Sequence, residues 1–304
     1  MSEAQVIAAT DAELGVVPSS KPRGLLVRAW EVFAENKLAL AGLSFIVFIL
    51  LFCFVGPHLY VTNQTNTDLS TYLCKPSGAH LLGCDDLGYD ELGRLMVGGQ
   101  TSLEVGLAAA VVSVLFGTLY GAISGFAGGI VDSLMMRVVD AGLSLPSLMV
   151  IIILSVIFHP TPSVIIFIIA IFYWFGVARL VRGETLSLRN REYVQAVKVI
   201  GGRPLRAVIK HVVPNAIGTI IVQATFAVAD AILTLSVLGF LTLGVAPPST
   251  DWGSMLSGGL NFIQGGNYWW LIYPPGVAII LTCIAFNFVG DALRDAFETR
   301  LQRR

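Results

Sequence analysis

Long stretches without a charged side chain constrain this chain more than any other feature of its sequence. Between Ala141 and Ala178 there is no Asp, Glu, Lys or Arg. The hydrocarbon core of a bilayer is roughly 30 Å thick, and a helix needs about 20 apolar residues to cross it. Of the 304 residues, 55% are hydrophobic and only 13% are charged, whereas an average soluble domain has about 25% charged residues. The sequence therefore predicts an all-α, polytopic membrane protein.

Six transmembrane helices can be placed along the chain. The stretch 141–178 is too long for one crossing, and His159-Pro160-Thr161-Pro162 predicts a turn that divides it into two spans. The other spans are expected at residues 38–59, 105–131, 216–243 and 269–289. Positive residues before the first span are also typical of signal peptides. Because no cleavage site of small residues follows, we expect a retained anchor.

The distribution of Lys and Arg predicts how these spans are oriented. With a cytoplasmic N-terminus, all of the 19 Lys and Arg residues except Lys75 and Arg94 lie in cytoplasmic segments, as the positive-inside rule requires. We therefore expect both termini in the cytoplasm. The chain then divides into a cytoplasmic segment 1–37, a first transmembrane helix 38–59, an extracytoplasmic loop 60–100, a core 101–290 with five transmembrane helices, and a cytoplasmic tail 291–304.

The cytoplasmic loop between the fourth and fifth spans, residues 182–215, is unusually long and basic. Good helix formers run from Glu192 to Ile200, the pair Gly201-Gly202 ends that helix, and Arg203-Pro204 can begin a second one. The apolar residues in these helices suit a position on a surface rather than a crossing. That surface is either a partner protein or the lipid headgroups, and the residues alone leave both open.

The same loop resembles the cytoplasmic loop of permease subunits in binding-protein-dependent ABC importers. That family has Glu-Ala-Ala, three further residues, Gly, and an ending of a hydrophobic residue and Pro. Here Gln195-Ala196-Val197, Gly201 and Val213-Pro214-Asn215 take these positions, so Gln and Val depart from the family pattern at two places. The resemblance implies a coupling helix that binds an ATPase subunit. The implied coupling residues are Glu192, Gln195, Ala196, Val197, Gly201, Gly202, Arg203, Pro204, His211, Pro214 and Asn215.

Further segments narrow the resemblance to the C-type permease of dipeptide and oligopeptide importers. They are residues 80–103, residues 125–147, and the stretches PPSTDWGSML and FNFVGDALRDAFETR. The resemblance implies a bacterial inner-membrane protein that works with a second, homologous permease subunit, two ATP-binding subunits and an extracytoplasmic peptide-binding protein. ATP and Mg are then expected on the partner ATPase subunits.

No cofactor and no enzyme activity are expected in this chain itself. It has no G-x-x-x-x-G-K-[ST] phosphate-binding loop and no recognisable metal or catalytic pattern. A net charge of −1 gives no general attraction for nucleic acid, so no nucleic-acid partner is expected. The apolar spans are expected to contact membrane lipid. The alternative class is a secondary transporter or channel driven by an ion gradient, but this class leaves the long basic loop unexplained. A membrane scaffold without transport is a third class, and it explains the loop only as a docking site. Nickel chelates or other small solutes are alternative cargo for the same ABC mechanism.

Several polar residues inside or beside the spans are candidates for a role in the path or in the structure. Arg137 can form an ion pair at helical spacing with Asp132 or Asp140, which serves either to fix helix ends or to gate. Asp230 interrupts the fifth span, and such a carboxylate usually faces a cavity or a partner. Asn287 lies in the sixth span, where a polar side chain usually forms a hydrogen bond to another helix.

Two of the four cysteines flank a short polar segment in the expected extracytoplasmic loop. A disulfide between Cys74 and Cys84 can form if this segment faces an oxidising compartment. The sequence leaves open whether it does. Cys53 and Cys283 lie in apolar stretches and are expected to be inert packing residues.

Overall fold

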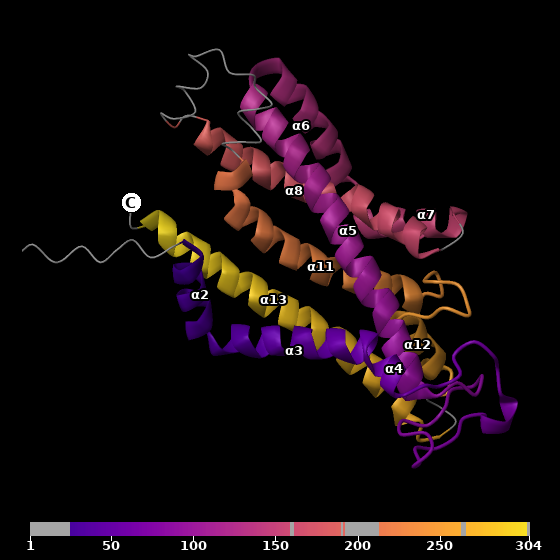
Figure 1. Cartoon of the computed structure of the whole chain (residues 1–304). Coiled ribbons are helices and arrows are strands. Elements are labelled where there is room, and N and C mark those ends of the chain that lie inside the picture. Colours follow the sequence, from indigo (N-terminus) through magenta and orange to yellow (C-terminus); the bar gives the residue numbers. More distant parts are fainter. Residues whose placement is uncertain (1–24, 159–160, 190, 192–212, 263–265, 303–304) are drawn as a thin grey trace, which may run out of the picture.

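The computed structural model describes residues 25–158, 161–189, 191, 213–262 and 266–302, and these are helical with connecting loops (Figure 1). Five stretches are long and apolar enough to cross a membrane, which confirms the prediction of an all-α membrane protein. The five helices concerned are α3 (Lys37–Phe54), α5 (Glu91–Ala127), α8 (Pro162–Leu188), α11 (Ile217–Phe240) and α13 (Tyr273–Gln302). The shorter elements are α2 (Leu25–Glu35), α4 (Gly56–Leu59), η1 (Leu69–Thr71), α6 (Gly129–Ser144), α7 (Ser147–Ile157), η3 (Val213–Asn215), α12 (Trp252–Leu260) and η4 (Trp269–Leu271).

The third of the six expected spans is a bent pair of helices rather than one straight helix. Helices α6 and α7 meet at an angle of 80°. The bend lies at Leu145, which is extended (φ −82°, ψ 139°) because Pro146 follows it. Helix α5 ends at the side of the bundle where α8 also ends, so α6 and α7 together must carry the chain back across (Figure 1). Counted as one span, the pair gives six crossings.

Two helices extend well beyond the spans that hydropathy predicts. Helix α5 begins at Glu91, inside the segment 60–100 that was expected to be loop. It starts there because Asp90 caps it, with Oδ1 accepting a hydrogen bond of 2.8 Å from the backbone N–H of Gly93. Helix α13 likewise continues to Gln302, through most of the expected tail 291–304.

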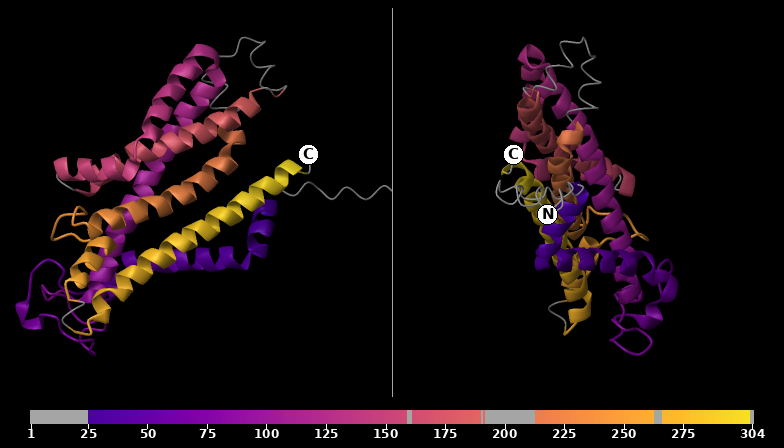
Figure 2. Two further views of the ribbon diagram at one scale, coloured as in Figure 1. Left: turned by 180° about the vertical axis from the view of Figure 1, so that it is seen from behind. Right: turned by 60° about the vertical axis from the view of Figure 1, so that its left-hand side comes forward.

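The long helices lie side by side in the order α8, α11, α13 and α3, and α5 crosses them (Figures 1 and 2). Glycines allow α5 and α8 to touch at the backbone. A Cβ atom on Gly121 would lie 2.2 Å from the carbonyl oxygen of Ala178, and one on Gly117 would lie 2.7 Å from that of Trp174. The tight contact fixes α8 against α5 along much of its length.

The bundle has two ends that carry different elements (Figure 1). The η3 end contains η3, the N-terminal end of α11 and the C-terminal ends of α5, α8 and α13. The α12 end contains α4, α12, η4 and the loop of residues 60–90. These two ends position the candidate sites described below.

Candidate functional sites at the two ends of the bundle

A carboxylate at the η3 end joins three helices. Asp132 on α6 accepts hydrogen bonds from Arg182 on α8, at 2.6 Å from Nε and 2.7 Å from Nη2, and from Ser124 Oγ on α5 at 2.5 Å. Asp132 is only 8% exposed. A bidentate guanidinium–carboxylate pair of this kind is both strong and directional. It fixes the start of α6 to α5 and α8.

A second pair between the same helices is exposed. Arg179 on α8 donates from Nη2 to Asp140 Oδ1 on α6, and both side chains are more than half exposed. The predicted pairing of Arg137 with Asp132 or Asp140 is therefore wrong. Helix α6 lies along α8, so arginines of the neighbouring helix reach both carboxylates, and sequence spacing within α6 does not decide the partner.

The expected coupling loop leaves this end of the bundle from two anchored points. Arg189, just after α8, donates from Nη1 to the Gly125 carbonyl of α5 at 3.1 Å. Thr219, in the first turn of α11, donates to Glu184 Oε1 of α8 at 3.2 Å. Of the predicted coupling residues, Pro214 and Asn215 lie in η3. The others lie outside the described residues: Glu192, Gln195, Ala196, Val197, Gly201, Gly202, Arg203, Pro204 and His211.

Asp230 is exposed on α11, together with the apolar side chains Leu233 and Val237 one and two turns further on. The hydroxyl of Tyr173 on α8 donates to the backbone carbonyl of Asp230 at 3.1 Å and lies 2.5 Å from Thr234 Oγ1. Helices of the described chain thus leave the Asp230 carboxylate uncovered. A carboxylate at this depth in an apolar helix needs a partner or water.

Two further polar residues differ from the sequence-based expectation. Within the described chain, Asn287 is exposed on α13 and forms no hydrogen bond to another helix, so the expected bond is not observed. Glu104, which sequence reasoning missed, is an exposed carboxylate in the fourth turn of α5. The span was expected to start at residue 105, which hid Glu104. The cap at Asp90 is the signal that could have extended the helix to include it.

At the α12 end, a disulfide joins Cys74 to Cys84 in the loop before α5. Asp90 ties the same loop to the helix. Its Oδ2 lies 2.9 Å from His80 Nδ1 and accepts a hydrogen bond of 2.9 Å from the Tyr60 hydroxyl. Among the described residues, Cys74, His80 and Cys84 are the one group with the spacing of metal ligands. Both sulfur atoms are used in the disulfide and His80 Nδ1 contacts Asp90, so this group is not a metal site.

A buried acidic residue caps α12, and the tryptophan that follows it holds this helix against α5. Asp251 accepts hydrogen bonds from the backbone N–H (3.0 Å) and the hydroxyl (2.6 Å) of Ser254. Burial raises the pKa of Asp251, and these hydrogen bonds oppose the shift. The adjacent Trp252 is fully buried and donates from Nε1 to the Leu95 carbonyl of α5 at 3.0 Å. This bond joins the start of α12 to the N-terminal part of α5.

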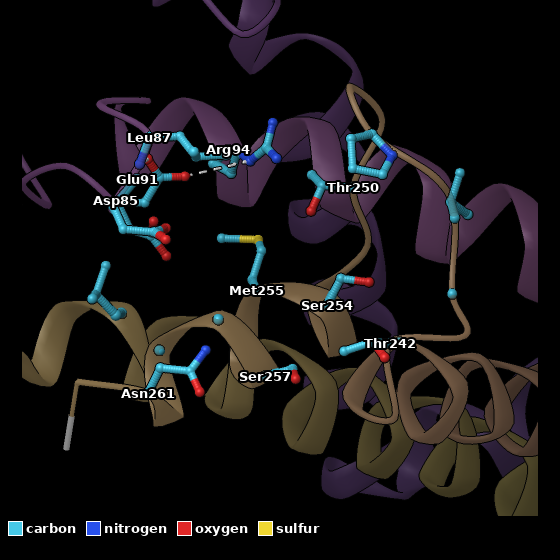
Figure 3. A pocket seen from close by; sticks show the side chains of 18 of the residues that line it. Asp85, Leu87, Glu91, Arg94, Thr242, Thr250, Ser254, Met255, Ser257 and Asn261 are labelled. Carbon is cyan, nitrogen blue, oxygen red and sulfur yellow. Dashed lines mark hydrogen bonds and ion pairs between the residues drawn. The ribbon is translucent and has the colours of Figure 1, made fainter. Parts of the chain in front are cut away.

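An open cavity of about 290 Å³ lies between the loop, the start of α5 and α12 (Figure 3). Acidic residues and Arg94 line one side, and hydroxyl and amide side chains line the other. The polar lining residues are Asp85, Asp86, Glu91, Arg94, Thr242, Ser249, Thr250, Ser254, Ser257 and Asn261. This cavity could not be predicted from the sequence, because residues about 150 positions apart form it.

Comparisons with known protein families match two segments of the chain. The family described as binding-protein-dependent transport system inner membrane component matches residues 117–303. The N-terminal TM domain of oligopeptide transport permease C matches residues 24–76.

Individual relatives extend the similarity to at least 90% of the chain. The dipeptide transport system permease protein DppC of Bacillus subtilis is 40% identical, covering 90% of this chain and 86% of the relative. The oligopeptide transport system permease protein OppC of Bacillus subtilis is 40% identical, covering 94% and 93%. OppC of Haemophilus influenzae is 39% identical, covering 91% and 89%.

Proposed function

Because the chain belongs to the family of inner membrane components of binding-protein-dependent transport systems, we propose that it forms the translocation path of an ATP-driven importer of dipeptides or oligopeptides. The observation that carries this proposal is the 40% identity to dipeptide and oligopeptide permeases over at least 90% of the chain. The ion-gradient-driven transporter, the alternative class, has no such support. Nickel or another small solute remains the alternative cargo.

The path lies between this chain and a second, homologous permease subunit. The exposed face of α11 supports this arrangement, because it places the Asp230 carboxylate beside apolar side chains with no described helix over it. A lipid-facing carboxylate is costly, whereas one that borders a water-filled path is not. We assign Asp230 to the path and keep Glu104 and Asn287 as further candidates on exposed faces.

The loop of residues 182–215 couples the path to two ATP-binding subunits, which hold ATP and Mg. Gln195 to Pro204 are assigned to the contact with the ATPase. The structure supports this role at the two ends of the loop, where Arg189 and Thr219 connect it to α5 and α8. Because of these hydrogen bonds, a displacement of the loop also displaces α5 and α8. Asp132 and Arg182 then hold α6 to α8 as they move.

The η3 end faces the cytoplasm of a bacterium, and both termini lie there. The distribution of Lys and Arg supports this orientation in the inner membrane. The α12 end then faces the extracytoplasmic side, where a disulfide is stable. The peptide-binding protein delivers its cargo at this end.

Purification of the tagged chain from its native membrane in mild detergent tests the proposal. Mass spectrometry should identify a second permease and two ATP-binding subunits. The complex is then placed in proteoliposomes and supplied with its binding protein. It should take up a radiolabelled dipeptide only when ATP is present on the side of the membrane where the ATP-binding subunits lie. Recovery of the chain as an active homo-oligomer without ATPase would refute the proposal in favour of a secondary transporter.

A further inference from the structure

The cavity at the α12 end carries an excess of negative charge. Three carboxylates line it, those of Asp85, Asp86 and Glu91, and Arg94 is the one basic residue among the described lining residues. When all four are ionised, the lining has a charge of −2. The residues that line the cavity thus supply one positive charge for three negative ones.

Arg94 is already engaged by the protein. Its Nε lies 3.8 Å from Asp85 Oδ2, its Nη1 donates to the Pro248 carbonyl at 3.2 Å, and its guanidinium lies 4.3 Å from the centroid of the Tyr89 ring. Asp85 in turn accepts hydrogen bonds from the backbone N–H groups of Leu87 and Tyr89. Burial raises the pKa of Asp85, and these hydrogen bonds and Arg94 oppose the shift. Asp85 and Arg94 therefore form a satisfied pair.

Glu91 is different, because within the described chain its carboxylate makes no direct hydrogen bond or ion pair, although the charge of Arg94 acts on it from a longer distance. The residue is 2% exposed and lines the cavity (Figure 3). The one ion pair of Arg94 in the described chain goes to Asp85 and not to Glu91. Only its backbone is bonded, with the N–H donating to the Gly83 carbonyl at 3.0 Å. A carboxylate removed from water without a partner is strongly unfavourable. A cation inside the cavity supplies the missing partner.

The opposite wall suits a cation that carries several N–H donors. Ser254, Ser257 and Asn261 present hydroxyl and amide groups on this wall (Figure 3). Each can accept a hydrogen bond. A volume of about 290 Å³ lies at the lower limit of ligand pockets and suits a single side chain or a very small peptide.

We propose that this cavity is a binding subsite for one organic cation, a primary ammonium or a guanidinium group, with Glu91 as its ion-pair partner and Asp86 as a second acidic contact. The cation can come from the protonated amino terminus of the cargo or from a Lys or Arg side chain of the protein that delivers it. The site concerns equilibrium binding, so it can be tested without ATPase subunits.

The test is an NMR titration of the purified full-length chain in lipid nanodiscs with three small probes. N-acetyl-lysine amide carries one side-chain ammonium, and N-acetyl-norleucine amide has a similar shape without the charge. Alanyl-alanine amide presents a protonated amino terminus without a carboxylate, so it is the second cationic probe. We expect one or both cationic probes to bind and the norleucine probe not to bind. Binding of the lysine probe alone assigns the site to a partner side chain, and binding of alanyl-alanine amide alone assigns it to the cargo.

Variants then identify the partner of the cation. Glu91→Gln keeps the shape and should weaken binding of the cationic probe by about thirtyfold, whereas Asp68→Asn, an exposed acid outside the cavity, should not change it. If Glu91→Gln does not remain monodisperse, the half-buried Asp86→Asn gives the same test, with an expected loss of about fivefold. Three outcomes would overturn the proposal. They are equal binding of the charged and neutral probes, no binding of either cationic probe, and unchanged binding in a folded variant that lacks one of the two carboxylates.

Discussion

Two ion pairs connect α6 to α8, and their different burial makes a quantitative prediction. Asp132 and Arg182 have side-chain exposures of 11% and 31%, whereas Asp140 and Arg179 have 57% and 56%. Both pairs join a carboxylate of α6 to a guanidinium of α8. The substitutions Asp132→Asn and Asp140→Asn therefore remove the same charge from the same helix and differ mainly in solvent access.

The expected losses follow from the contacts of each carboxylate. Asp132 accepts two hydrogen bonds from Arg182 and one from Ser124. A hydrogen bond to a charged group contributes about 1.5–3 kcal/mol, and breaking a fully buried pair costs about 3–5 kcal/mol. Because Asn still accepts some of these bonds and Arg182 keeps some water, we expect a loss of about 3 kcal/mol for Asp132→Asn. Asp140→Asn should cost less than about 1 kcal/mol, as exposed pairs do.

Equilibrium unfolding of the purified chain in mixed micelles, with increasing fractions of a denaturing detergent, measures this difference. Trp174, one of the five tryptophans, lies in the cluster where α6 meets α8, so the part of the fluorescence that comes from Trp174 reports on this contact. In a double-mutant cycle, Asp132→Asn and Arg182→Gln should couple by more than about 1.5 kcal/mol, well above the value for an exposed pair. If Asp132→Asn costs no more than Asp140→Asn, burial does not set the strength of these pairs and the reasoning fails.

Three further predictions follow from the packing and the proposed path. Gly121→Val should destabilise the bundle by about 3 kcal/mol in the same unfolding assay, because its Cβ meets the Ala178 backbone, whereas Gly176→Ala should be tolerated in open space; equal stability of the two variants would contradict the proposed packing. Asp230→Asn should lower dipeptide uptake by the assembled complex in proteoliposomes, and unchanged uptake would remove this carboxylate from the path. Gly201→Pro should abolish ATP-dependent uptake while membrane insertion, followed by protease accessibility, stays normal; surviving uptake would disprove the coupling role.

The sequence predicts the helices well where the bilayer alone decides their length. The expected spans 38–59 and 216–243 correspond to α3 with α4 and to α11. Hydropathy fails where local chemistry starts or breaks a helix. The cap at Asp90 begins α5 well before its apolar stretch, and Pro146 bends the third span. Both signals are present in the sequence, but a search for uncharged stretches passes over them.

Contacts between helices could not be predicted in the same way. Asp132 and Arg182 are 50 residues apart, and nothing in the spacing of either helix points to the other. The cavity at the α12 end depends on the approach of α12 to the start of α5, which Trp252 and Leu95 fix across 157 residues. Tertiary packing decides such contacts, so one sequence without aligned relatives cannot reveal them.

The two ends of the bundle differ in how their buried carboxylates are hydrogen-bonded. Asp132 at the η3 end is 8% exposed and accepts three hydrogen bonds, so its charge is satisfied within the chain and holds helices together. Glu91 at the α12 end is 2% exposed and has no such bond from the described residues. A buried charge must be paired or be lost. The same physical rule thus assigns a structural role to the first carboxylate and leaves the second to be completed by a cation from outside the chain.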